Sequence, residues 1–171
     1  MVDVAFKDLC IDATAGNGRP AAVARFWADA LGLEATGAGG EDSTLSPPHG
    51  DADERTIWVN AVPEDIAGKT RVHLDLCVPD GDPAPLLAAG ASLIRSAAPG
   101  RPWHVLEDPD GAAFCVFPPA TEPGAGPSGH GAYELVVDAA DAGSLAAWWA
   151  ERTGATVHHH PVRPFVWLEG V

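Results

Sequence analysis

Two stretches, "VARFWADALGLEA" at residues 23–35 and "LAAWWAERTGATV" at residues 145–157, resemble each other and decide the fold of this chain. The segments before them also match, since "LCIDATA" at residues 9–15 corresponds to "LVVDAAD" at residues 135–141. The offset is 126 residues before the first helix and 122 residues within it, so the earlier copy carries four extra residues in its strand-to-helix turn. Matching at a period near 120 residues implies a duplicated module.

The earlier copy predicts a strand, a helix and further strands. In residues 21–31 the apolar residues recur at the spacing of one helix face, Gly32 supplies a stop, and Pro20 suits the first turn. A strand is expected at residues 4–11 with Asp12 closing it, another begins at residues 33–35, and "TIWVNAV" at residues 56–62 is a third. The Gly-, Pro- and acid-rich segment between them predicts a long loop around one short strand.

A second pass of the same kind begins at Arg71. It comprises a strand "VHLDLCVP" (72–79), a short helix "APLLAAG" (84–90), a strand "ASLIRSA" (91–97) and a hairpin at residues 102–119. The hairpin turns at Asp-Pro-Asp-Gly, residues 108–111, because Pro sets the turn entry and Gly accepts a positive φ. We therefore expect a complete two-unit domain at residues 1–118, a Pro/Gly-rich linker at 119–128 and a partial second module at 129–171.

The composition, with 46% hydrophobic and 20% charged residues, is typical of a soluble globular protein. The formal charge of −14 would repel a phosphate backbone, so nucleic acid is not expected as a partner. No apolar run is long enough to span a membrane, and the start does not resemble a secretory signal. Cys10, Cys77 and Cys115 each lie in an apolar run, as reduced buried thiols do. We expect a cytoplasmic protein without membrane contact.

Four segments together resemble the vicinal oxygen chelate superfamily, in particular its glyoxalase-like and bleomycin-resistance-like proteins of actinobacterial type. They are "ARFWADALGLE" (24–34), "RVHLDLCVPD" (71–80), "LLAAGASLI" (86–94) and "DPDGAAFCVFPP" (108–119). The resemblance implies an α+β fold in which paired βαβββ units form a curved, half-closed mixed sheet around a cleft. It covers residues 1–118 as a complete domain and residues 129–171 as the opening of a second.

For metal-dependent members, the resemblance implies one ligand from the first strand of each unit, usually His or Gln, and one from the last strand, usually Glu. The first-strand positions hold Asp8 and His73 here, and Glu134 in the partial unit. The last-strand position of the second unit, four residues after the Asp-Pro-Asp-Gly turn, holds Cys115, and Asn60 is the nearest match in the first unit. The usual ligand set is therefore only partly present.

Two interpretations of His73 follow. In the one we favour, His73 lines an organic-ligand cleft or accepts a hydrogen bond at a strand start, and no metal or other cofactor is needed. In the alternative, Asp8, His73 and Cys115 converge as a carboxylate, an imidazole and a thiolate, which can hold a divalent metal such as Zn, Fe, Mn or Ni. The residues alone identify no catalytic group.

Other side chains are candidates for the same cleft. Trp58 and Trp103 lie in or beside predicted strands and can stack on a planar ligand. Arg71 and Arg95 could pair with a carboxylate. The run His158–His160 is expected to be a polar edge strand. The expected ligand-binding cleft comprises His73, Asp8, Trp58, Trp103, Cys115 and Arg71.

The partial module, at about 40 residues, is near the lower limit for independent folding. Its helix presents Leu145, Trp148 and Trp149 on one face. We expect aromatic pairs on such helices to pack against a sheet, as Phe26 and Trp27 should in the first copy. A partner chain is expected to complete the partial module, which would make the protein a homodimer.

The function predicted from the sequence is therefore that of a glyoxalase-like protein that binds a small molecule. It would sequester or process an aromatic or apolar metabolite or antibiotic. One alternative is a metal-dependent lyase or extradiol-type dioxygenase that uses His73. The other is an interaction module that dimerises through the partial unit.

Overall fold

The computed structural model describes residues 7–37, 42–48, 56–65, 70–119 and 133–170, and the expected linker lies outside them except for Pro119. The chain divides into two compact units, one spanning residues 8–136 and the other built on residues 137–170. Among the helices in these described ranges, none is long and apolar enough to cross a membrane.

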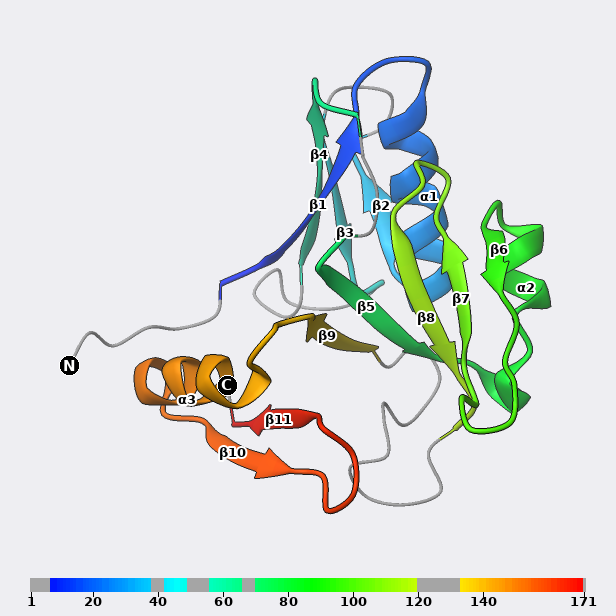
Figure 1. The fold of residues 1–171 in the computed structure, drawn as a ribbon. Coiled ribbons are helices and arrows are strands. Elements are labelled where there is room, and N and C mark those ends of the chain that lie inside the picture. Colours follow the sequence, from blue (N-terminus) through cyan, green and yellow to red (C-terminus); the bar gives the residue numbers. More distant parts are fainter. Residues whose placement is uncertain (1–6, 38–41, 49–55, 66–69, 120–132, 171) are drawn as a thin grey trace. The chain divides into compact units, whose positions relative to one another are not determined.

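The first βαβββ unit forms a four-stranded sheet in the order β1-β4-β3-β2 (Figure 1). Its elements are β1 (Leu9–Thr14), α1 (Arg19–Leu31), β2 (Glu34–Thr36), β3 (Ser43–Ser46) and β4 (Ile57–Val62). The prediction that Asp12 closes the first strand is wrong, because β1 pairs with β4 in parallel as far as Thr14 opposite Val62. The α1 helix ends as predicted, with Gly32 at a φ of 68° and its N–H bonded to Ala28 O.

The second unit repeats this topology in a five-stranded sheet, in the order β6-β7-β8-β5-β9 (Figure 1). Its elements are β5 (Val72–Cys77), a 3-10 turn η1 (Pro79–Gly81), α2 (Ala84–Ala88), β6 (Ser92–Arg95), β7 (His104–Glu107) and β8 (Ala113–Phe117). The β5 and β8 strands are parallel, as β1 and β4 are in the first unit. On its other edge β5 is joined by β9 (Tyr133–Val137), the first strand of the partial module. The α+β fold with mixed sheets is therefore confirmed.

A single hydrophobic core lies between the four-stranded and the five-stranded sheet, both of which belong to the first of the two compact units. The α1 helix buries Phe26 and Trp27, which are 1% and 3% exposed. Both rings contact Phe114 of β8, with ring centroids 5.6 Å and 5.2 Å apart respectively. The prediction that the first aromatic pair packs into the core is confirmed. Because Phe114 belongs to the second unit, this contact fixes the two units against each other.

The remaining elements are α3 (Ala142–Thr153), β10 (Thr156–His159) and β11 (Val166–Glu169), of which the two strands form an antiparallel hairpin. Asp141 begins α3 by accepting hydrogen bonds from the Ser144 amide and hydroxyl, at 2.9 Å and 2.7 Å. Within this chain Trp148 and Trp149 remain 46% and 41% exposed, so the second aromatic pair is not packed away by the described residues, and its cover by a partner chain stays a prediction. The two indoles pack edge to face on each other, at a centroid distance of 4.9 Å.

Candidate functional site

The alternation of side chains along β5 and β8 separates apolar from polar residues. Leu74 and Leu76 of β5 are buried in the core, so His73 and Asp75 project from the opposite face of the strand. On β8, Phe114 and Val116 are buried in the same core, and Cys115 lies between them in the sequence. Cys115 stands directly opposite Asp75 in the parallel ladder. One face of the sheet therefore gathers an imidazole, a carboxylate and a thiol.

These three side chains form a compact group, here called the polar cluster: His73, Asp75 and Cys115. One donor atom from each lies within 4.8 Å of the others. His73 Nε2 is 3.4 Å from Asp75 Oδ1, and the two side chains are 10% and 14% exposed. His73 Nδ1 and Asp75 Oδ1 are buried and have no hydrogen-bond partner in the part of the chain that the structure describes. Leaving such a group unpaired costs about 1–3 kcal/mol, so these atoms favour a partner.

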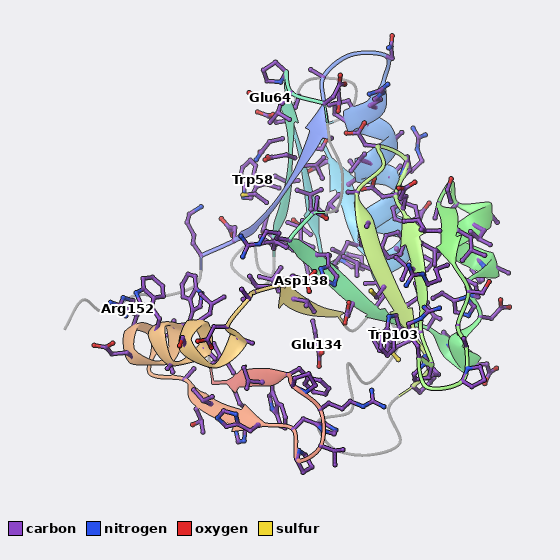
Figure 2. All side chains as sticks on the ribbon, in the orientation of Figure 1. Trp58, Glu64, Trp103, Glu134, Asp138 and Arg152 are labelled. Atoms are coloured by element: carbon purple, nitrogen blue, oxygen red, sulfur yellow. The ribbon has the colours of Figure 1, made fainter. Side chains whose placement is uncertain are left out.

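Glu134 brings a second carboxylate towards the cluster. It lies on β9, which is adjacent to β5 in the sheet (labelled in Figure 2). Partial burial, and secondly the charge of Asp75, raise the pKa of Glu134 above its ordinary value. The first-strand positions of the second unit and of the partial module, His73 and Glu134, thus lie on neighbouring strands.

A cleft of about 470 Å³ opens along the edges of β1 and β5. One wall is Leu9–Asp12 of β1 and the other is Val72–Leu74 of β5, while Trp27 and Phe114 border the cleft from the core and are 3% and 1% exposed. His73 belongs to both the cleft and the polar cluster. The remaining lining residues are Val62, Glu64, Asp65, Thr70, Asp108, Ala112, Ala113 and Leu135.

The cleft is apolar at its walls and acidic in its charged groups. Its ionisable oxygens come from Asp12, Glu64, Asp65 and Asp108, and among the described residues that line it none is Lys or Arg. Asp108 is buried and accepts a hydrogen bond from Trp27 Nε1 at 3.0 Å and from the amides of Asp110 and Ala112. Burial raises the pKa of Asp108 despite these bonds. The hydrogen bond from Trp27 thereby connects the Asp-Pro-Asp-Gly turn to α1 at the back of the cleft.

The residues predicted for the cleft are distributed over both sheets. Asp8 accepts a hydrogen bond from Trp58 Nε1 at 3.3 Å beside the first sheet. Trp103 stacks on Phe117, with ring centroids 5.2 Å apart, and lies well away from Trp58 (Figure 2). Arg71 is exposed at the start of β5.

Of the predicted cleft residues, the structure brings His73 and Cys115 together beside Asp75, and separately brings Asp8 together with Trp58. His73 is also the member of the predicted set that lines the cleft.

A divalent metal is the group that the family resemblance implies, and the residues present fit it through a different donor set. Asp8 is bonded to Trp58, and Asn60 Nδ2 donates to Asp12 Oδ1 at 3.5 Å, so both face partners of the first sheet. His73 and Cys115 are instead joined by Asp75, and imidazole, carboxylate and thiolate are all zinc ligands. The orphaned buried atoms of His73 and Asp75 agree with such a role.

Sequence reasoning missed Asp75 and the β1 wall of the cleft. Asp75 follows His73 by two residues in a predicted strand, and a period of two places both on one face. That signal was present in the sequence. The β1 wall carried none, because its position beside β5 depends on how the two sheets pack.

Comparison with known proteins gives a family. The model of the family described as a glyoxalase-like domain matches residues 8–117. No curated protein matches the chain.

Solved structures that resemble the chain include three proteins of low sequence identity. A gene product from Arabidopsis thaliana is 17% identical, with 68% of this chain and 99% of that chain covered and a TM-score of 0.49. A glyoxalase-related enzyme from Fulvimarina pelagi is 19% identical (78% and 99% covered, TM-score 0.48). A fosfomycin resistance protein from Mesorhizobium loti is 12% identical (66% and 90% covered, TM-score 0.46). At these identities the likeness concerns the fold alone.

Proposed function

Because the chain belongs to the glyoxalase-like domain family, we propose that it binds a small, partly apolar molecule, neutral or cationic, in the cleft between β1 and β5. The observation that carries this proposal is the cleft itself. Its volume of about 470 Å³ is within the range of small-molecule pockets, and its walls are mainly apolar. Sequestration of an aromatic or apolar metabolite or antibiotic is the activity that such a cleft supports best.

The lining determines which ligands are favoured. Trp27 and Phe114 border the cleft from the core side, where little of either ring is exposed, so the mainly apolar walls of β1 and β5 favour a small apolar ligand. The acids around the cleft, without a lining Lys or Arg in the described residues, disfavour an anion. We expect an anionic ligand to bind at least about tenfold more weakly than a neutral ligand of the same shape, which corresponds to about 1.4 kcal/mol.

The test compares 1-naphthalenemethanol with 1-naphthoate by equilibrium dialysis against the full chain treated with a chelator. The neutral probe should bind and the carboxylate should bind more weakly. Cys10→Trp places a large side chain at an exposed position of the β1 wall and should abolish binding. The matched control is Ala35→Trp on β2, an exposed position that does not line the cleft. Equal binding by Cys10→Trp and Ala35→Trp would contradict the proposal.

The polar cluster favours a second candidate, a metal-dependent lyase or extradiol-type dioxygenase that uses His73. His73 both borders the cleft and belongs to a group of metal-compatible side chains, so a bound molecule would lie beside the cluster. Oxygen uptake by the iron(II)-treated full chain in the presence of catechol tests the dioxygenase form. His73→Ala should abolish the uptake, and uptake that survives this substitution would exclude His73 from the reaction.

A further inference from the structure

We propose that the open edge of β1 binds an extended, positively charged peptide as an additional strand of the first sheet. The peptide pairs with the backbone of Cys10 and Asp12 and lies in the cleft between β1 and β5. This inference rests on the proposed function, because it names the class of molecule that the cleft holds. The residues that carry it belong to β1 and not to the polar cluster.

β1 is an edge strand, and its residues line the cleft. The first sheet has the order β1-β4-β3-β2, so among the described strands only β4 pairs with β1 (Figure 1). On the opposite wall, β5 already lies between β8 and β9. The strand with an open edge at the cleft is therefore β1, which contributes Leu9–Asp12 to the lining. Such an edge carries unpaired N–H and C=O groups and is a template for a further strand.

Two hydrogen bonds at the end of β1 show which backbone groups point to the open edge. The Ala15 amide donates to a carbonyl of β4 at 2.7 Å, whereas the Thr14 amide points away from β4 and donates to Asp110 Oδ2 at 2.6 Å. Successive backbone groups of a strand alternate in direction, so the groups of Cys10 and Asp12 share the direction of Thr14. Cys10 and Asp12 therefore present their N–H and C=O groups to the open edge.

Asp110 already acts at this edge as a strand partner would. Its side chain is 1% exposed, and one carboxylate oxygen lies beside the Thr14 amide, where the carbonyl of a neighbouring strand would accept. Its other oxygen is 3.5 Å from Arg19 Nη1, which holds the carboxylate in place. The edge is thus closed at Thr14, and among the described residues it stays open at Cys10 and Asp12.

The two faces of β1 determine which side chains the peptide needs. Leu9 and Ile11 pack against the hydrophobic core, whereas Cys10 and Asp12 are exposed on the other face. Side chains that stand opposite each other in paired strands share a face. Apolar side chains of the peptide therefore lie beside Leu9 and Ile11, and a cationic side chain lies beside Asp12. A segment that alternates apolar and cationic residues meets both requirements.

Charge complementarity selects a cationic peptide over an anionic one. Asp12 and Glu64 both line the cleft, and neither forms an ion pair with Lys or Arg in the part of the chain that the structure describes. The net charge of −14 adds to the negative potential of these two carboxylates. In recognition by strand addition, the main-chain hydrogen bonds supply affinity and the alternate side chains supply specificity.

The test uses the isotope-labelled full chain, treated with a chelator, and the capped peptide Ac-Val-Lys-Val-Lys-Val-NH2. Saturating peptide should slow hydrogen exchange of the Cys10 and Asp12 amides about tenfold or more, as followed by NMR. The Ile11 amide points to β4 by the same alternation and is the internal control, so its exchange should not change.

A charge exchange tests the pairing of side chains. Asp12→Lys should weaken binding of the Lys peptide about tenfold or more and should strengthen binding of Ac-Val-Glu-Val-Glu-Val-NH2. Asp29→Lys is the matched control, because Asp29 is exposed on α1 and does not line the cleft. It should leave both affinities within about twofold of wild type. Circular dichroism of the two variants establishes that both are folded.

Two modified peptides test the pairing of backbones. One carries N-methyl groups on both Lys residues, and the other carries them on the second and third Val residues. Alternate amides of an extended peptide point to opposite edges, so only one of these sets faces β1. One modified peptide should therefore bind about tenfold or more weakly than the other.

The proposal is overturned if the Cys10 and Asp12 amides gain no protection, if the two N-methylated peptides bind equally, or if folded Asp12→Lys binds both peptides as Asp29→Lys does. Binding of 1-naphthalenemethanol to the same chain is measured separately. If this probe binds and the peptide does not, the proposed function stands and strand addition fails. If neither binds, both proposals fail.

Discussion

At the scale of single residues, the pair Trp27 and Asp108 joins the two βαβββ units. The indole N–H donates to a buried carboxylate oxygen at 3.0 Å, and the indole ring contacts Phe114. The bond crosses from α1 to the turn between β7 and β8. It therefore holds the back of the cleft and the core together.

We predict that Trp27→Phe lowers the free energy of unfolding by about 1–3 kcal/mol, because it keeps a ring but leaves the buried Asp108 oxygen without its donor. Urea unfolding measures the change. Trp58→Phe is the control, since Trp58 is 38% exposed and its hydrogen bond to Asp8 is exposed to solvent, and it should cost less than about 0.5 kcal/mol. Similar costs for the two variants would contradict the structural role of the Trp27 bond.

Asp108 also predicts a dependence of stability on pH. Burial raises its pKa in the folded chain above the ordinary value of 3.8, so the folded state binds more protons than the unfolded state between these two values. The contribution of Asp108 to stability therefore falls as pH rises through that window. The free energy of unfolding of wild type minus that of Asp108→Asn should therefore decrease as pH rises from about 4. A difference that increased with pH would mean that the pKa of Asp108 is not raised.

Single residues also show how much of the candidate site could be predicted from the sequence. The family resemblance placed His73 on the first strand and Cys115 on the last strand of the second unit, and the structure has them on β5 and β8, which pair with each other. Asp8 and Asn60 occupy the corresponding family positions in the first unit but bond Trp58 and Asp12 instead. The strand of a residue follows from local pattern, but the partner of its side chain depends on tertiary packing. The grouping of side chains in the polar cluster was therefore only half predictable.

At the scale of elements, β9 changes the second sheet. The strand belongs to the repeated module by sequence, yet it extends the sheet at β5 and lies mostly within the unit of residues 8–136. The repeat predicted a strand here, and hydrophobic pattern alone could not predict its neighbour. With β9 in place, β5 is a central strand with β8 on one side and β9 on the other.

We predict that a chain ending at Val137 keeps this arrangement, whereas a chain ending at residue 128 loses it. Removing β9 leaves one edge of β5 without strand hydrogen bonds, so its outward-facing amides should exchange with deuterium faster. Hydrogen exchange measured by NMR on both truncated chains tests this. Amides in α1, far from that edge in the sequence, serve as the internal control. Equal exchange in β5 of the two chains would contradict the pairing.

At the scale of the whole molecule, the internal repeat identifies an incomplete surface. Trp149 in α3 is the sequence equivalent of Trp27 in α1, and Trp148 is the equivalent of Phe26. In α1 these positions are 1–3% exposed because Phe114 and Asp108 of another unit cover them. In α3 the same positions are more than 40% exposed. The comparison shows what a covered face of this helix looks like.

We predict that the chain self-associates through this face of α3. Fully burying a large aromatic side chain contributes about 1.5–3 kcal/mol, and Trp148 and Trp149 are 46% and 41% exposed, so covering both on each of two copies contributes about 3–5 kcal/mol towards self-association. Light scattering of the full chain should give the mass of a dimer, and Trp149→Gln should shift it to a monomer. Ala147→Gln is the control, because Ala147 is exposed on the other side of the same helix. A wild-type monomer at micromolar concentration, or a Trp149→Gln variant that stays dimeric, would contradict the prediction.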